Sequence, residues 1–281
     1  MADRFYEGGK NLKPYWIMPV FFLVLASCAH HPPLIVMDSG HTPSDYGAVS
    51  CTGKKEIDYN DELVAAISGE LAQKCRKFIL TRTQSQPIRH DDDLKNHLMD
   101  RPDDEKWQKK KDIYSRIALA NELQAGLFIS IHHDSVQEHR LSRTGDGKIV
   151  DVRDDYKQQF DPGYSIYIAN DPGYPNTGQH YPDSLKFAEI CARRMQAMGR
   201  NPSTYPEETP DTENYQAIDA SAGIYNSRNL LTVLRNANMP AVLIEVGVIV
   251  DVEDERVISS PSFKNRFAKA IADSIDEFWD Y

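Results

Sequence analysis

The sequence predicts a single α/β domain, in which a largely parallel, twisted sheet of about five or six strands carries helices on both faces. Three observations support this fold class. The 281 residues are 41% hydrophobic and 26% charged, which suits a buried core and excludes disordered, collagen-like and disulfide-scaffold chains. Short apolar runs alternate along the chain with segments of helical spacing. The sequence also lacks the internal repeats of solenoids and propellers.

Five short apolar runs are predicted to form the strands. Continuous apolar runs of this length are typical of strands that are buried on both faces of a parallel sheet. In chain order, the runs are residues 34–37, 78–83, 127–132, 165–169 and 241–246. The fourth run lies between two copies of Asp-Pro-Gly-Tyr, a sequence typical of tight turns.

Apolar residues at helical spacing mark segments between and after the strands. Steps of three and four residues place them on one face of a helix, which can pack on the sheet. The stripes are Val64, Ile67, Leu71 and Cys75; Tyr114, Ile117, Ala118 and Leu123; Ala188, Cys191, Met195 and Met198; Leu230, Leu231, Leu234 and Ala237; and Phe263, Phe267, Ile271, Ile275 and Phe278. The first helix is predicted to begin between Glu56 and Asn60.

The amino-terminal segment is predicted to be a secretory signal. The apolar run 16–27 follows a stretch that carries Arg4, Lys10 and Lys13. As a helix this run is about 18 Å long, which is too short for a hydrocarbon core of roughly 30 Å. Residues 1–27 are therefore predicted to be a signal peptide, and the alternative is a buried helix at the amino terminus.

A lipid anchor is predicted directly after this segment. Residues 25–28, Leu-Ala-Ser-Cys, resemble a bacterial lipobox, in which the cysteine is lipidated. We expect a lipidated Cys28 and a short tether over residues 28–33, followed by the folded domain over 34–281. The domain would then be held on a membrane of the cell envelope and face the periplasm. Ala29 in place of Asp favours the outer membrane over the inner one.

Charge and cysteine content restrict the partners and the covalent structure. A net charge of −10 repels a phosphate backbone, so no nucleic-acid partner is expected. Cys51, Cys75 and Cys191 lack C-x-x-C spacing, so a disulfide framework is not expected. Cys75 and Cys191 lie on apolar helix stripes and are predicted to be core residues, whereas a bridge that involves Cys51 stays open.

Polar residues at the carboxyl ends of the predicted strands are the first candidates for a ligand site, because parallel sheets bind ligands there. His41 follows the first strand, His132 closes the third, and Glu56 lies at the predicted start of the first helix. Two imidazoles and one carboxylate are a common ligand set for a catalytic Zn²⁺, with the fourth position left for water. We therefore predict that these residues hold one Zn²⁺ ion. Each of them, taken alone, is also compatible with a purely structural role.

Glu245 is the candidate general base. It is the single charged residue in the apolar run 241–250, where an ionised carboxylate without a partner is energetically costly. Such a carboxylate is typical of a group whose pKa is raised for proton transfer. The alternative is a structural ion pair with an arginine such as Arg82 or Arg228.

Six blocks of sequence, in order, resemble the zinc-dependent N-acetylmuramoyl-L-alanine amidases of the cell wall, in the amidase type 3 family. The blocks are 35–49 (IVMDSGHTPSDYGAV), 55–60 (KEIDYN), 80–83 (LTRT), 116–121 (RIALAN), 128–132 (FISIH) and 239–247 (MPAVLIEVG). The resemblance spans about residues 34–278, and six ordered blocks are far more specific than one motif.

This resemblance implies a peptidoglycan hydrolase, which cleaves the amide bond between N-acetylmuramic acid and L-alanine of the stem peptide. His41, Glu56 and His132 match the metal ligands of the family, and Glu245 matches its catalytic glutamate. It also implies that the metal and Glu245 together activate water, and that the metal stabilises the oxyanion while Glu245 passes the proton to the leaving amine. Residues 34–281 are then a zinc amidase catalytic domain.

The sequence departs from the family pattern at a few positions. Ser39 stands where the family usually has Pro, and Thr42 where it often has Gly. His133 and Asp134 stand where a small residue and Asn commonly follow the last ligand. Since adjacent strand residues point to opposite faces, either His132 or His133 could be the ligand, and the alignment favours His132. The remaining histidines of the domain, His90, His97, His139 and His180, are predicted to be surface residues.

Three long polar segments border the loops that are expected to surround the site. We expect one of these segments to cover or shape the substrate groove; the alternative is that they are plain flexible insertions. They are residues 84–111, 134–162 and 200–222. Related enzymes block their zinc with such an element until a partner removes it, so an activator protein is an expected type of partner beside peptidoglycan.

Two other functions remain open from the sequence. One is a non-catalytic envelope lipoprotein that binds peptidoglycan, and the other is a zinc carboxypeptidase that acts on stem peptides. The three-ligand set argues against the first, because a structural zinc site would use a fourth protein ligand.

Overall fold

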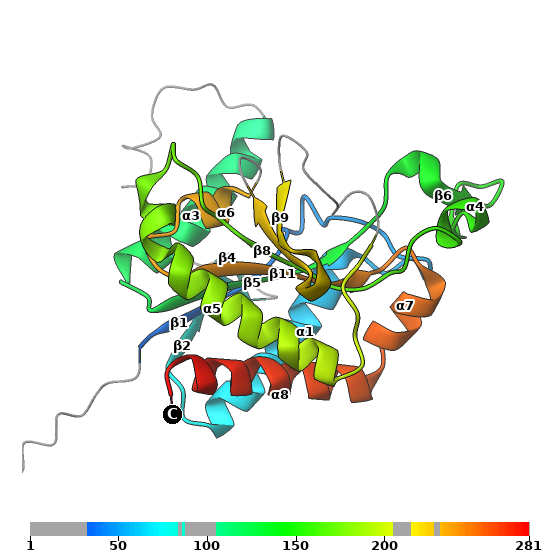
Figure 1. The fold of residues 1–281 in the computed structure, drawn as a ribbon. Helices are drawn as coiled ribbons and strands as arrows, with labels where there is room; N and C mark the ends of the chain where they lie inside the picture. The colour runs from blue at the N-terminus through cyan, green and yellow to red at the C-terminus, as the bar shows by residue number, and fades with distance from the viewer. Residues whose placement is uncertain (1–32, 84–85, 88–104, 205–214, 228–230, 281) are drawn as a thin grey trace, which may run out of the picture. The chain divides into compact units, whose positions relative to one another are not determined.

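The structure, a computed structural model, describes residues 33–83, 86–87, 105–204, 215–227 and 231–280 (Figure 1). Within the described residues, a seven-stranded sheet forms the centre of the fold. In spatial order, its strands are β2 (Phe78–Leu80), β1 (Ile35–Ser39), β5 (Leu127–Asp134), β11 (Ala241–Val248), β8 (Ser165–Ile168), β10 (Ile224–Ser227) and β9 (Tyr215–Asp219).

The sheet is mostly parallel. β1 pairs in parallel with β2 and β5, β5 with β11, and β10 with β8. The pairs β11 with β8 and β10 with β9 are antiparallel. The predicted α/β domain with a largely parallel sheet is confirmed, with more strands than the expected five or six.

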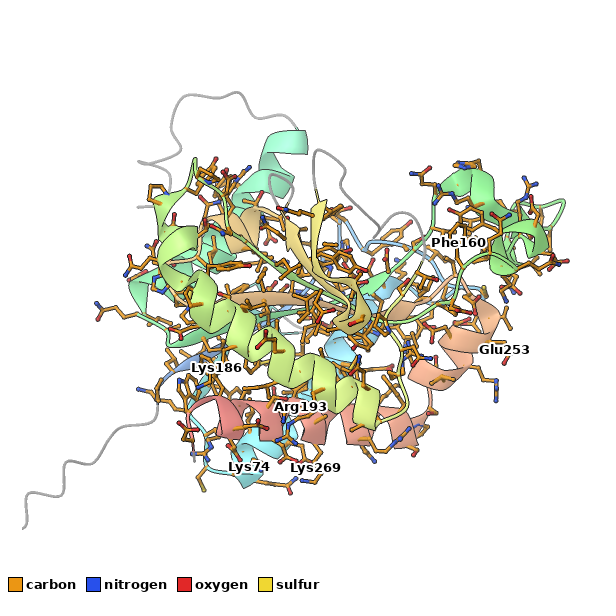
Figure 2. The ribbon with its side chains drawn as sticks, in the orientation of Figure 1. Lys74, Phe160, Lys186, Arg193, Glu253 and Lys269 are labelled. Atoms are coloured by element: carbon orange, nitrogen blue, oxygen red, sulfur yellow. The ribbon has the colours of Figure 1, made fainter. Side chains whose placement is uncertain are left out.

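Helices cover both faces of the sheet. The apolar stripes of α1 (Glu56–Gln73), α5 (Pro175–Ala197) and α8 (Pro261–Phe278) pack on one face, together with α7 (Val252–Ile258). On the other face lie α3 (Glu105–Glu122) and α6 (Thr232–Arg235). Figure 2 shows charged side chains such as Arg193 and Lys269 on the outside of the first helical layer, where both side chains are more than half exposed.

The described residues also form two short strand pairs and several short helices outside the central sheet. β3 (Arg82–Thr83) pairs with β4 (Gln86–Pro87), and β6 (Leu141–Arg143) pairs with β7 (Ile149–Val152). The remaining short helices are η1 (Glu138–Arg140), α4 (Asp154–Lys157) and η2 (Ala220–Ala222). In the described part of the chain, every helix is too short or too polar to span a bilayer.

Four predicted elements differ in the structure. The strand expected over residues 78–83 is divided into β2 and β3. The segment 134–162 contains β6, β7 and α4, and the polar segment 200–222 contains β9, which pairs with β10. The helix expected around Leu234 is reduced to the single turn α6. Strands β6, β7 and β9 were not predicted because they are short and partly polar, so their apolar pattern is weak.

The cysteine predictions are partly wrong. Cys191 is buried in the core as expected, but Cys75 is exposed. Helix α1 ends at Gln73, and Cys75 adopts a left-handed conformation with φ 53°, so its side chain leaves the helical stripe. Cys51, Cys75 and Cys191 are all free thiols, which excludes a bridge among them; Cys51 is buried and donates to the Val250 carbonyl oxygen, 3.1 Å away.

Candidate metal and catalytic site

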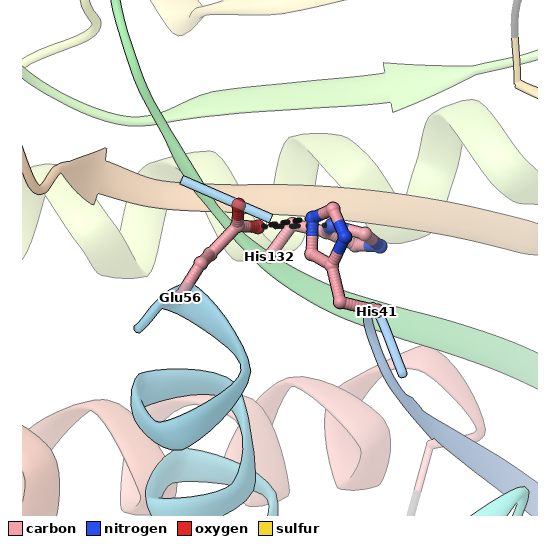
Figure 3. A group of neighbouring side chains, drawn as sticks. All are labelled: His41, Glu56 and His132. Carbon is pink, nitrogen blue, oxygen red and sulfur yellow. Dashed lines mark hydrogen bonds and ion pairs between the residues drawn. The ribbon is translucent and has the colours of Figure 1, made fainter. Parts of the chain in front are cut away.

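Three predicted residues meet at the carboxyl edge of the sheet (Figure 3). His41 comes from the loop after β1, Glu56 from the first turn of α1, and His132 from the end of β5. The distance to Glu56 Oε1 is 2.9 Å from His41 Nε2 and 3.2 Å from His132 Nδ1. One potential ligand atom from each residue lies within 4.8 Å of the other two. The arrangement could hold a metal ion, and the role of the three residues as ligands stays a prediction.

Glu56 is fixed by the backbone around it. Its Oε2 accepts the Ala48 N–H at 3.0 Å, and its Oε1 accepts the His133 N–H at 3.2 Å. Burial acts to raise the pKa of Glu56, but hydrogen bonds from His132 and His41 and their charge outweigh it and hold the pKa below its usual range. The side chain is therefore an ionised carboxylate, which suits a ligand for a divalent cation.

His41 adopts a backbone conformation that is rare for a residue with a side chain. Its φ is 67°, in the left-handed region. Two buried arginines hold this conformation, because the His41 carbonyl oxygen accepts from Arg82 Nε at 3.0 Å and from Arg116 Nη2 at 2.5 Å. The orientation of the predicted ligand thus depends on residues far away in sequence.

Both arginines also bind the residues before His41. Arg82 Nη2 donates to the Gly40 carbonyl oxygen at 3.1 Å, and Arg116 Nη1 donates to the Ser39 carbonyl oxygen at 2.8 Å. The charge of Arg82 is balanced by Asp61, 2.7 Å away. The loop 39–41 is therefore held by charged donors on its carbonyl groups.

Asp38 balances the charge of Arg116. Its Oδ1 accepts from Arg116 at 3.0 Å and from the Thr81 hydroxyl, and its Oδ2 accepts from the Ser130 hydroxyl at 2.6 Å. Burial acts to raise the pKa of Asp38, but the Arg116 charge and the hydroxyl groups of Ser130 and Thr81 keep it below its usual value. This buried carboxylate is ionised and fully engaged.

Two glycines allow the close approach of His41, Glu56 and His132. A side chain at Gly40 would collide with the His132 ring, and one at Gly47 would collide with the Glu56 carboxylate and the His41 ring. Gly47 also has φ 76°, a conformation that favours glycine. Larger residues at either position would displace the predicted ligands.

Glu245 lies beside His132 in the sheet. The two residues are register partners in the parallel pair β11–β5, so their side chains share one face. One extra residue follows on β11, because Glu245 pairs with His132 but Val248 already pairs with Asp134. Bulges of this kind often lie next to active sites. The register therefore brings the predicted base to the predicted ligands.

Glu245 Oε2 is buried and has no hydrogen-bond partner among the described residues. Burial raises the pKa of Glu245 well above its usual value, and the charges of Asp134 and Glu56 raise it further. Arg82, one proposed ion-pair partner, is bound to Asp61 and the loop 39–41 instead. Arg228, the other one, lies outside the described residues.

His133 points to the opposite face from His132 and is buried against α1. Its Nδ1 lies 2.7 Å from Asn60 Oδ1, and its ring contacts the Tyr59 ring at 5.4 Å between centroids. Burial lowers the pKa of His133 to about 3, so the ring is neutral. His132, not His133, joins the cluster with His41 and Glu56. His139 is exposed and His180 is half-buried, while His90 and His97 lie outside the described residues.

A cavity of about 360 Å³ lies near the site, and its lining includes neither the predicted ligands nor Glu245. It lies between the loop that precedes α1 and the hairpin β6–β7, and it is lined by Ala48, Ser50, Val136, Leu141, Arg143 and Ile149 among others. Ala48 links the cavity to the site, because its N–H binds Glu56. Residues of the segment 134–162 therefore line a cavity that is linked to the cluster through Ala48.

The sequence did not single out Asp38 or Arg116, and it indicated Arg82 only as a possible ion-pair partner of Glu245. Asp38, Arg82 and Arg116 act on the loop 39–41 through hydrogen bonds that join β1 to β3 and α3. A signal for Asp38 was present, because it is a charged residue at the end of an otherwise apolar strand. The arginines gave no such signal beyond their place in the blocks 80–83 and 116–121.

Comparisons with known proteins agree with the fold. Residues 35–277 match the family model described as N-acetylmuramoyl-L-alanine amidase. The chain resembles the catalytic domain of CwlV, an N-acetylmuramoyl-L-alanine amidase from Bacillus (Paenibacillus) polymyxa, with a TM-score of 0.56 and 22% identity over 88% of this chain and 98% of that chain. No curated protein is similar enough in sequence to be matched.

Two further solved structures share the fold. Ami1, the N-acetylmuramyl-L-alanine amidase of Mycobacterium smegmatis, has a TM-score of 0.59 and 18% identity over 88% of this chain and 97% of that chain. The CwlD amidase of Clostridioides difficile, solved in complex with the GerS lipoprotein, has a TM-score of 0.58 and 16% identity over 88% of this chain and 98% of that chain.

Proposed function

The chain belongs to the N-acetylmuramoyl-L-alanine amidase family, and we propose that it is a peptidoglycan hydrolase that cleaves the amide bond between N-acetylmuramic acid and L-alanine of the stem peptide. One observation carries this proposal: a cluster of two histidines and one carboxylate lies beside Glu245, whose Oε2 is buried and has no hydrogen-bond partner among the described residues. A three-residue ligand set next to a potential base is the arrangement of a hydrolytic metal site.

The proposed cofactor is one Zn²⁺ ion, held by His41, Glu56 and His132. The donor set fits the ion, because two imidazoles and an ionised carboxylate already lie within 4.8 Å of one another. Bound there, Zn²⁺ would supply a Lewis acid that polarises the amide carbonyl and acidifies the attacking water. The fourth position of a catalytic zinc site is left for water or substrate.

Glu245 is the proposed general base. In its ionised form, it takes a proton from the water that attacks the lactyl carbonyl carbon. The carboxyl group then gives this proton to the amide nitrogen as the C–N bond breaks, which releases the L-alanine amine and a lactyl carboxylate. The position of Glu245 beside His132 supports this role, since the base must lie near the centre that activates the substrate.

The supporting residues hold the ligands in place before the substrate arrives. Arg82 and Arg116 fix the carbonyl group of His41, and Asp38 fixes Arg116. Charged hydrogen bonds in a buried region resist rearrangement, so the ligand geometry costs little to form during the reaction.

The hairpin β6–β7 is proposed to shape the substrate groove. Its residues Leu141 and Ile149 form one wall of the cavity next to Ala48, and Ala48 in turn contacts Glu56. Substrate in this cavity would therefore lie close to the proposed metal. An activator protein is proposed to act on this hairpin. This part of the proposal does not depend on the mechanism of amide hydrolysis.

Digestion of purified peptidoglycan by the full chain in detergent tests the function. The amidase releases stem peptides with free L-alanine amino termini and leaves intact glycan strands, and mass spectrometry identifies both. Shortened stems that are still attached to the glycan would favour a zinc carboxypeptidase. Binding without any release would favour a non-catalytic peptidoglycan-binding lipoprotein.

A lipid anchor on Cys28 is proposed to hold the domain in the cell envelope. Residues 1–27 and Cys28 lie outside the described residues, and the proposal is supported by the lipobox-like sequence alone. Cells that are fed a labelled fatty acid should incorporate the label into the protein, and Cys28→Ser should remove it. Separation of the two membranes would then test the expected outer-membrane location.

A further inference from the structure

Ser165 is a buried polar residue to which no role has been given. It lies directly opposite Glu245 in the antiparallel pair β11–β8. Its side chain is completely buried, and its Oγ has no hydrogen-bond partner among the described residues. Glu245 Oε2 is likewise buried and without such a partner. A hydroxyl donor and a carboxylate acceptor therefore lie unpaired in neighbouring strands.

Ser165 and Glu245 point to the same face of the sheet. Directly opposite residues of an antiparallel pair project together, with Cβ atoms about 4.5–5.5 Å apart. Tyr167 and Leu243, two positions away on each strand, both belong to the core between the sheet and helices α3 and α6. The alternation of strand side chains places Ser165 and Glu245 on that same face.

The row continues to the proposed metal ligands. Glu245 pairs with Ser165 on one side and with His132 on the other, so the three residues lie side by side on β8, β11 and β5. His132 is part of the cluster with His41 and Glu56. The hydroxyl group thus lies on the side of the proposed base that faces away from the cluster.

We propose that Ser165 is a positioning residue for Glu245, and that its hydroxyl group donates a hydrogen bond to the Glu245 carboxylate during catalysis, directly or through one water molecule. This inference rests on the proposed function. A donor on one carboxylate oxygen fixes the rotation of the group and leaves the other oxygen free to take the proton from the attacking water.

The absence of other partners favours this role, because Ser165 Oγ and Glu245 Oε2 are both buried without a hydrogen bond among the described residues. Buried polar groups are almost always hydrogen-bonded, so two complementary orphan groups in register are expected to use each other.

Ser165→Ala tests the proposal because it removes the hydroxyl group and little else. Peptidoglycan turnover should show a kcat lower by about tenfold, with KM and zinc content unchanged. Ser274→Ala is the matched control: Ser274 is also completely buried, but its hydroxyl group donates to the Ala270 carbonyl oxygen inside α8. The control should keep the wild-type kcat.

A double variant separates positioning from packing. In the Glu245→Gln background the base is absent, so adding Ser165→Ala should lower kcat by less than about twofold. A packing defect would lower kcat by the same factor in both backgrounds. That result, or a kcat for Ser165→Ala within about twofold of wild type, would overturn the inference.

The role inferred for Ser165 can be wrong while the proposed function is right. If the wild-type chain releases L-alanine termini and Glu245→Gln does not, but Ser165→Ala behaves as wild type, only the role of Ser165 is wrong. If the wild-type chain releases no such termini, both the proposed function and the role of Ser165 are wrong.

Discussion

Two buried polar regions lie at the same edge of the sheet and differ in how their groups are paired. Around β1, Asp38 accepts hydrogen bonds from Arg116, Thr81 and Ser130, and the His41 carbonyl oxygen accepts from both buried arginines. On β11 and β8, Glu245 Oε2 and Ser165 Oγ have no partner among the described residues.

This difference distinguishes residues that support the site from residues that are proposed to take part in the reaction. A fully paired charge network is rigid, and here it fixes the backbone of the residue proposed to bind the metal. A carboxylate with one buried, unpartnered oxygen atom reduces stability, but its proton affinity is raised and that oxygen atom remains available. The comparison predicts that variants on the β1 side change stability and metal binding, whereas variants on the β11 side change the rate.

The largest effect is expected when a predicted metal ligand is replaced. His41→Ala should lose both the zinc and all measurable activity, because two remaining ligands bind the ion weakly. Metal analysis of the purified protein and a peptidoglycan digest measure the two losses. His180→Ala, in α5, is the control and should keep one zinc ion per chain, about the wild-type content. Stoichiometric zinc in His41→Ala would show that His41 is not a ligand.

Glu245→Gln should lower kcat by about 10²–10⁴-fold and leave the zinc content intact. Its thermal stability should be equal to or above that of the wild type, because a neutral amide replaces a carboxylate near Asp134 and Glu56. Melting, metal analysis and turnover are compared with Glu253→Gln, a control at a position that is 69% exposed. Unchanged turnover would remove the assignment of Glu245 as the base.

Arg116→Met should be destabilised by about 3–5 kcal/mol, because it leaves the buried Asp38 carboxylate without its charged partner. Denaturant unfolding without metal measures this loss. Arg256→Met is the control: the Arg256 side chain is 74% exposed and pairs with Glu253 on α7, so about 0–1 kcal/mol is expected. Equal losses in both variants would mean that the β1 network does not stabilise the fold.

A smaller effect is expected on the pH dependence of stability. The pKa of Asp38 is lowered in the folded protein, so Asp38 contributes stability above its unfolded pKa of about 3.9. That contribution is lost as the pH falls through the lower, folded pKa. Asp38→Asn should be less stable at neutral pH, and its free energy of unfolding should depend less on pH below about 4. Unfolding measured between about pH 3 and 6 checks the slope, and parallel curves for both proteins would contradict it.

Much of the fold could be predicted from local patterns. The continuous apolar runs of β1, β5, β8 and β11 and the spaced stripes of α1, α5 and α8 carry their own signal, because burial imposes a period on the sequence. Strands β9 (Tyr215–Asp219) and β10 (Ile224–Ser227) carry no such sequence signal, because both are short and mix polar with apolar residues. Their place depends on pairing with each other and with β8.

The candidate site was predictable in its residue types but not in its geometry. Polar residues at strand ends and the family resemblance selected His41, Glu56, His132 and Glu245. The left-handed backbone of His41 could not be read from its neighbours, because the arginines that hold it lie 41 and 75 positions further along the chain.

The sequence by itself determined the alternation of strands and helices, and with it the edge of the sheet where polar side chains gather. Only the tertiary structure decided which hydroxyl group lies opposite Glu245 and which arginines hold the loop 39–41. It also placed His132, which the family resemblance favoured, in the cluster, and His133 on the opposite face. The physical reason is that burial imposes a periodic pattern of apolar residues on each segment. The register between strands arises from pairing between segments, so it cannot be recognised in the sequence of one segment.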